Sequence, residues 1–109
     1  MKYLYGEFTE NQIAQTKKSL QSSIFYLLLY VDKDTRDEYP NVNVQQSIKG
    51  LLMKIGGLNE LLMCQPELVS VMSLLQAALI EYKNPKFSYK KYRKLILDAG
   101  SEIMKLKEV

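Results

Sequence analysis

Apolar residues recur every three or four positions along four segments of this chain, and that spacing is the period of an α-helix. In the first segment the repeat is carried by Ile13, Leu20, Ile24, Leu27 and Val31. Thr9, followed three residues later by Gln12, matches a capping box. We therefore expect the first helix to span about residues 9–31.

The second and third segments are also helical by their spacing. Asn43 is suited to cap a helix over about residues 44–64, which contains the adjacent residues Gly56 and Gly57. Two glycines in a helix interior cost on the order of 2 kcal/mol relative to alanine. We predict that the second helix is kinked there, or that it lies very close to another helix.

Pro66 suits the first turn of a third helix, over about residues 66–82, that is apolar almost all round and is therefore expected to be buried on several sides. Asn84 and Pro85 end it, and Ser88 can cap a fourth helix over about residues 88–107. Residues 32–42 contain four acids and lack periodicity, which indicates a surface loop. Together these elements predict one all-α domain over residues 1–109, an antiparallel four-helix bundle.

The residue types present exclude several kinds of chemistry. The chain has no histidine and a single cysteine, Cys64. It therefore lacks the residues that zinc clusters and Ser-His-Asp or Cys-His catalytic sites require. The acids of the 32–42 loop do not match a calcium loop, because Arg36, Asp37 and Asn43 replace an oxygen ligand, a glycine and a glutamate. We expect no enzymatic activity, no metal and no cofactor.

The longest apolar run, residues 24–31, is far shorter than the ~20 residues that a membrane-spanning helix requires. The N-terminal residues do not match a signal peptide, because polar residues 9–12 follow where an apolar stretch would continue. The unpaired Cys64 suits a reducing compartment. We therefore expect a cytoplasmic protein with no membrane span.

The main functional signal is a run of cations between Tyr82 and Lys94. This segment holds six of the 15 cationic side chains and no acid, so the rest of the chain has more acids than cations. The six residues, called the basic face below, are Lys83, Lys86, Lys90, Lys91, Arg93 and Lys94. Local positive charge of this kind attracts phosphate groups or an acidic protein surface.

Aromatic residues alternate with these cations, as in surfaces that stack on single-stranded nucleic acid. A helical wheel at 100° per residue places Tyr89 and Tyr92 on the apolar arc of the fourth helix. Lys90, Lys91 and Lys94 fall on the opposite arc. The wheel therefore predicts tyrosines in the core and a separate cationic face. A merely solvated face, a site for an acidic partner and a nucleic-acid site all stay open.

A second signal is a surplus of apolar side chains near the end of the first helix. Four residues, called the apolar surface below, cover an arc that is polar one or two turns earlier: Phe25, Tyr26, Leu29 and Tyr30. Either the aromatic-rich residues 3–8 fold back over this surface, or it contacts a partner protein or a second copy of the chain.

In size, helicity and charge the chain resembles several small bacterial regulators, including bacteriocin immunity proteins, and the resemblance is one of architecture alone. We expect a non-enzymatic interaction or regulatory protein, such as an inhibitor, an immunity factor or an assembly subunit. It would act through the apolar surface and the basic face, most simply as a homodimer. The alternative is an accessory protein that binds nucleic acid through Lys83 to Lys94.

Overall fold

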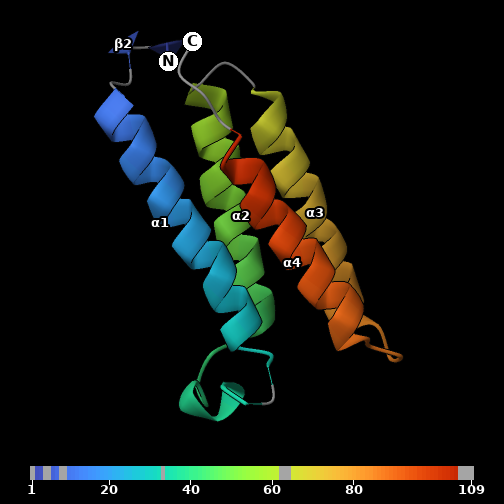
Figure 1. Ribbon diagram of the computed structural model, residues 1–109. Coiled ribbons are helices and arrows are strands. Elements are labelled where there is room, and N and C mark those ends of the chain that lie inside the picture. Colours follow the sequence, from blue (N-terminus) through green and yellow to red (C-terminus); the bar gives the residue numbers. More distant parts are fainter. Residues whose placement is uncertain (1, 4–5, 8–9, 33, 62–64, 106–109) are drawn as a thin grey trace.

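The computed structural model describes residues 2–3, 6–7, 10–32, 34–61 and 65–105. Its four long helices are α1 (Glu10–Leu29), α2 (Val44–Leu61), α3 (Pro66–Lys83) and α4 (Tyr89–Ile103). Successive helices run in opposite directions along a common axis (Figure 1). The predicted all-α antiparallel four-helix bundle is confirmed.

Helices α2 and α4 begin where the sequence predicts because the expected capping residues act as caps, whereas α1 ends at Leu29 and α4 at Ile103, before the predicted residues 31 and 107. Asn43 Oδ1 accepts a hydrogen bond from the Gln46 backbone N–H at 3.1 Å, at the start of α2. Pro66 stands in the first turn of α3, and Asn84 follows its last residue. Thr9, Cys64 and residues 106–109 lie outside the described residues, so the capping box and the place of Cys64 stay predictions.

Each helix buries one apolar stripe in a shared core. The largest fully buried side chains are Leu20, Ile24, Leu27, Ile48, Ile55, Leu68, Leu75, Tyr92, Ile96 and Ile103. The expectation that α3 is buried on several sides is wrong for its outer stripe, where Val69 and Ile80 are 48% and 71% exposed. Because α3 packs against α2 and α4, its remaining side faces solvent.

The α2 helix runs without a break through Gly56 and Gly57. A methyl group added to Gly56 would lie 3.8 Å from Met72 Sδ, an ordinary van der Waals contact, and one added to Gly57 would meet nothing within 4 Å. The predicted close helix contact is therefore absent. The kink at this position stays a prediction.

Three short elements were not expected from the sequence. The strands β1 (Lys2–Tyr3) and β2 (Gly6–Glu7) form a minimal antiparallel pair, and a 3₁₀ turn, η1 (Arg36–Glu38), lies in the loop after α1. The strand pair lies at the N-terminal end of α1, far from the end that carries the apolar surface (Figure 1). The described part of the N-terminal segment therefore does not cover that surface, and Leu4, Tyr5 and Phe8 lie outside the described residues.

The four pairs of neighbouring helices do not pack against each other to the same extent. The most extensive helix pair is α3 with α4, followed by α2 with α3 and α1 with α4, whereas α1 makes few contacts with α2. The side between α1 and α2 lies across the bundle from the α3–α4 side, which carries the basic face.

Candidate functional site

Side-chain acceptors order the turn between α3 and α4, which carries Lys86 of the basic face. Asn84 Oδ1 accepts a hydrogen bond from the Lys86 N–H at 2.9 Å. Glu81 Oε1 accepts one from the Ser88 N–H at 2.9 Å, and Ser88 Oγ in turn accepts a longer one from the Lys91 N–H at 3.4 Å. The backbone of the turn is therefore held at both ends, and α4 begins where the sequence predicts.

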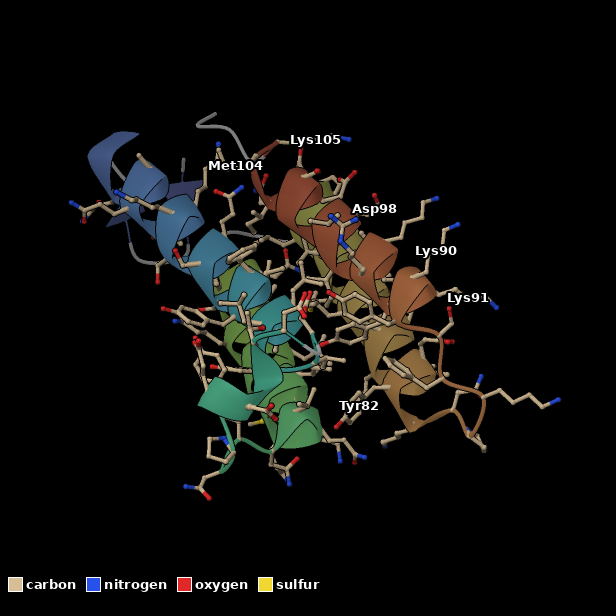
Figure 2. All side chains as sticks on the ribbon, turned by 60° about the horizontal axis from the view of Figure 1, so that its bottom comes forward. Tyr82, Lys90, Lys91, Asp98, Met104 and Lys105 are labelled. Atoms are coloured by element: carbon tan, nitrogen blue, oxygen red, sulfur yellow. The ribbon has the colours of Figure 1, made fainter. Side chains whose placement is uncertain are left out.

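All six side chains of the basic face are exposed. Figure 2 shows Lys90 and Lys91 extending away from α4. No carboxylate of the described residues forms an ion pair with any of the six, and the ion pair of Lys105 with Glu102, at 2.8 Å, lies at the far end of α4. The structure thus leaves all six predicted side chains exposed, and it brings Lys91 and Lys94 together at one hollow between α3 and α4.

The tyrosines of α4 belong to the core, as the wheel predicts. Tyr92 is fully buried, and its hydroxyl donates a hydrogen bond to the Leu27 carbonyl oxygen at 2.7 Å. Tyr89 is half-buried and donates to Asp32 Oδ2 at 2.8 Å. Burial raises the pKa of both phenols, and the hydrogen bond to Asp32 raises that of Tyr89 further. Both phenols are therefore uncharged at neutral pH, and their hydrogen bonds join α4 to the C-terminal end of α1 and the residues just after it.

The other aromatic rings of the basic segment pack against one another. Tyr82, Phe87 and Tyr92 form a cluster in which the ring centroids lie 5.8–6.3 Å apart, with the rings tilted or edge-on. Phe87, at 37% exposed, is the most accessible of the three. The alternation of aromatic and basic residues in the sequence therefore does not produce an open stacking platform.

An apolar hollow of about 410 Å³ adjoins the basic face between α3 and α4. Ala77, Ile80 and Leu95 supply its apolar lining, and Lys91 and Lys94 also line it. The sequence does not single out Ile80, because a helix that is apolar all round gives no sign of which flank stays exposed to solvent. The hollow thus combines an apolar contact with two cations, and Glu81, whose carboxylate binds the Ser88 N–H, also lines it.

The four residues of the apolar surface do not form one patch. Phe25, 53% exposed, faces α4 and lines a hollow of about 180 Å³ with Leu97 and Gly100. Leu97 is itself 41% exposed, so two large apolar side chains border this hollow. Leu29 is half-buried, and its carbonyl oxygen accepts a hydrogen bond from Thr35 Oγ1 at 2.7 Å.

Tyr26 and Tyr30 lie on the α2 side of α1, where Tyr39 from the following loop packs on both. The Tyr39 ring meets Tyr30 edge-on at 5.0 Å and Tyr26 at 6.3 Å, and Tyr26 stacks on Tyr30 at 6.1 Å. The loop therefore covers part of the surplus apolar area. An aromatic residue beside Pro40 was the signal in the sequence that could have suggested this.

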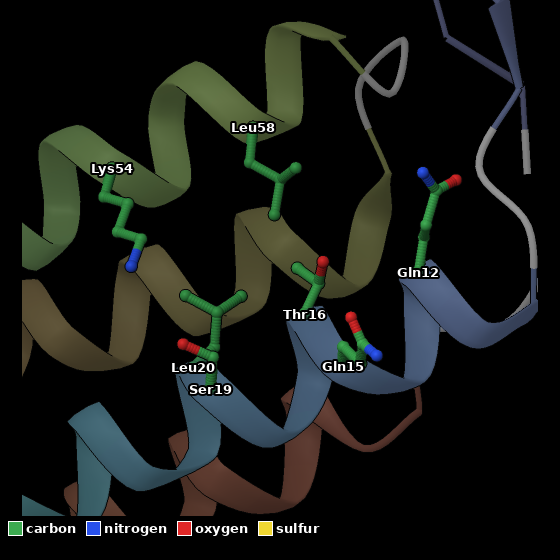
Figure 3. A pocket seen from close by; sticks show the side chains of 7 residues that line it. All are labelled: Gln12, Gln15, Thr16, Ser19, Leu20, Lys54 and Leu58. Carbon is green, nitrogen blue, oxygen red and sulfur yellow. The ribbon is translucent and has the colours of Figure 1, made fainter.

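The loosely closed side between α1 and α2 contains two further hollows, of about 480 Å³ and 320 Å³. Lys54 lines both of them. Figure 3 shows Lys54 and Leu58 of α2 across from Thr16 and Leu20 of α1 in the larger hollow. The sequence predicts no site here.

Among the described residues, no group of three or more His, Cys, Asp or Glu side chains could hold a metal ion. No helix in the described part of the chain has the length and apolar character needed to cross a membrane. Comparisons of the chain with protein families, curated proteins and solved structures found no match. A function must therefore be inferred from the surfaces themselves.

Proposed function

We propose that this protein is a non-enzymatic cytoplasmic interaction module that binds an acidic surface of a partner protein through its basic face. An inhibitor, an immunity factor or a subunit of an assembly would act in this way. The observation that carries the proposal is the cluster of six exposed cations, none of them in an ion pair with a described carboxylate. Carboxylates on a partner would relieve the mutual repulsion of these charges and speed the encounter.

The surroundings of the basic face favour a protein over a nucleic acid. Stacking on bases requires aromatic rings with a free face, whereas Tyr92 is buried and Tyr82 and Phe87 pack around it. Ile80, 71% exposed between α3 and α4, offers the apolar contact that protein interfaces use beside their charges. Binding of nucleic acid by the same cations is the alternative outcome of the experiment below.

The proposal includes a homodimer formed through Phe25. This side chain and Leu97 are both largely exposed at one hollow between α1 and α4, and large apolar side chains are enriched in the buried centres of homodimers. The dimer contact lies on a different side of the bundle from the hollow beside Ile80. A dimer would therefore leave that hollow available.

The test compares two charge reversals of equal size at exposed lysines. In one variant Lys90 and Lys94 are changed to Glu, and in the control Lys18 and Lys49 are changed to Glu. The probes are a labelled polyglutamate peptide, single-stranded DNA and single-stranded RNA, each titrated at about 50 mM and about 200 mM salt. We expect the wild type to bind the peptide, with about tenfold weaker binding for Lys90→Glu/Lys94→Glu and little change for the control.

Failure of the wild type to bind the peptide at low salt would overturn the proposal, and so would equal losses in both variants. Tighter binding of DNA or RNA than of the peptide, falling steeply with salt, would favour the nucleic-acid alternative.

A further inference from the structure

Ile80 is largely open to solvent in the hollow between α3 and α4. It is 71% exposed, whereas Ala77 and Leu95, which supply the rest of the apolar lining, are half-buried. A partner's apolar side chain seated in this hollow would cover apolar area of all three residues. Removing such area from water is favourable, so the hollow can act as an apolar contact point for a partner.

Two lysines of α4 add positive charge to the same hollow. Lys91 and Lys94 both line it, and both are exposed. They stand three residues apart on one helix, a rise of about 4.5 Å along its axis. A lysine side chain is an apolar stem that ends in a charged ammonium group. The stems can therefore add to the apolar lining while the ammonium groups stay in water at its edge, where a partner's carboxylates can pair with them.

Glu81 is the one carboxylate among the residues that line this hollow. Its Oε1 accepts a hydrogen bond from the Ser88 N–H at 2.9 Å, so the group serves the turn before α4. No carboxylate of the described residues forms an ion pair with Lys91 or Lys94. The charged lining therefore has a positive balance, and it suits carboxylates on a partner.

Exposure alone does not distinguish Ile80 from other large apolar side chains. Val69 on α3 and Met53 on α2 are 48% and 79% exposed, and neither lines any of the hollows described above. Phe25 and Leu97 share a hollow that has no charged residue in its lining. Ile80 differs because it shares its hollow with two cations, and an apolar centre with a polar rim is the arrangement found in protein interfaces.

We infer that the partner of the basic face presents a large apolar side chain between two carboxylates, with the apolar side chain against Ile80 and the carboxylates at Lys91 and Lys94. This inference rests on the function proposed for that face and specifies the chemistry of its partner. The carboxylates would supply the long-range attraction, and the apolar side chain would supply selectivity among acidic surfaces. A uniformly acidic surface would leave Ile80 in water.

The test uses two labelled peptides of equal charge, each with a run of glutamates on either side of one central residue. The central residue is leucine in one peptide and glutamine in the other. By fluorescence anisotropy at about 50 mM salt, we expect the wild type to bind the leucine peptide about fivefold more tightly than the glutamine peptide. Only the leucine side chain gains from the apolar lining of the hollow.

Three variants assign the preference to the hollow. Ile80→Gln should abolish it and leave the affinity for the glutamine peptide within about twofold of the wild-type value, because no charge is changed. Val69→Gln is the matched control on the same helix and should keep the preference. Lys91→Gln/Lys94→Gln should weaken the binding of both peptides, by about tenfold. Circular dichroism checks that each variant is folded.

The outcomes separate this inference from the proposed function. Equal affinities of the wild type for the two peptides, or a preference that persists in Ile80→Gln, would overturn the inference and leave the proposed function standing. A wild type that binds neither peptide would overturn both.

Two further measurements test other occupants of the hollow. Vesicles of phosphatidylcholine and phosphatidylglycerol that bind the wild type more tightly than the leucine peptide does, and that no longer bind Ile80→Gln, would assign Ile80 to a membrane surface. A dimer in light scattering that Ile80→Gln abolishes would assign the hollow to a second copy of the chain. Either result would overturn the inference.

Discussion

The hydroxyl of Tyr92 donates a hydrogen bond to the carbonyl oxygen of Leu27, 65 residues away in the sequence, at 2.7 Å. In a continuous helix that carbonyl would accept from Val31, but the Val31 N–H bonds to the Leu28 carbonyl instead, at 3.1 Å. Carbonyls in the last turn of a helix lack intrahelical donors. Tyr92 therefore supplies a donor that α1 lacks and joins the end of α1 to α4 within the core.

Replacing Tyr92 with Phe should lower the free energy of unfolding by about 1–3 kcal/mol, because the buried Leu27 carbonyl loses its donor while the ring is kept. Tyr89→Phe is the matched comparison. Its partner Asp32 lies where water reaches it more easily, so the loss should be smaller. Urea denaturation followed by circular dichroism measures both. Equal midpoints for the wild type and Tyr92→Phe would show that the bond contributes nothing net to stability.

The same phenol makes stability depend on pH in the alkaline range. Burial raises the pKa of Tyr92 above its ordinary value of 10.0, so the folded protein keeps a proton that the unfolded chain releases. This contribution is fully present below pH 10 and is lost as the pH rises toward the folded pKa, at about 1.4 kcal/mol per pH unit. Between about pH 10 and about pH 11.5, stability should therefore fall less steeply in Tyr92→Phe than in the wild type. Parallel pH profiles of the two proteins would contradict this.

The contacts around Tyr92 also show what the sequence could and could not predict. The helical wheel places Tyr92 in the core, and Asn43 and Ser88 cap the helices they precede, because these signals depend on residues nearby in the chain. Which atom accepts the hydrogen bond from the Tyr92 hydroxyl depends on where α1 ends and on the position of α1 along the bundle axis relative to α4. Neither is encoded in the periodicity of one helix.

Some features of the candidate sites were likewise predictable from residues close together in the sequence, and others were not. The exposure of Lys90, Lys91 and Lys94 was predictable, because these three cations share one arc of α4. The hollows that Lys54 lines were not predictable, because apolar stripes on α1 and α2 fit a tightly packed helix pair as well as a loosely packed one. The cover that Tyr39 places over Tyr26 depends on the path of a loop that has no periodicity.

Gly57 provides a direct test of the α2 interior. An added methyl group would meet nothing within 4 Å, so Gly57→Ala should raise the free energy of unfolding by about 0.5–1 kcal/mol through helix propensity. Gly56→Ala should also be tolerated, since its methyl group would lie at an ordinary distance from Met72 Sδ, 3.8 Å. Thermal denaturation compares the three proteins. A lower midpoint for Gly57→Ala would mean that the helix is distorted at this position.

The proposed homodimer predicts a change of mass on substitution of Phe25. Light scattering over a range of concentrations should show the wild type approaching twice its chain mass of 12.6 kDa. Phe25→Glu should remain a monomer, because a charge in a buried apolar contact costs several kcal/mol unless it is paired. Met53→Glu is the matched control, since Met53 is 79% exposed on α2, away from the hollow that Phe25 and Leu97 border. A wild type that stays monomeric at every concentration would remove the dimer from the proposed function, and equal dissociation of both variants would place the contact elsewhere.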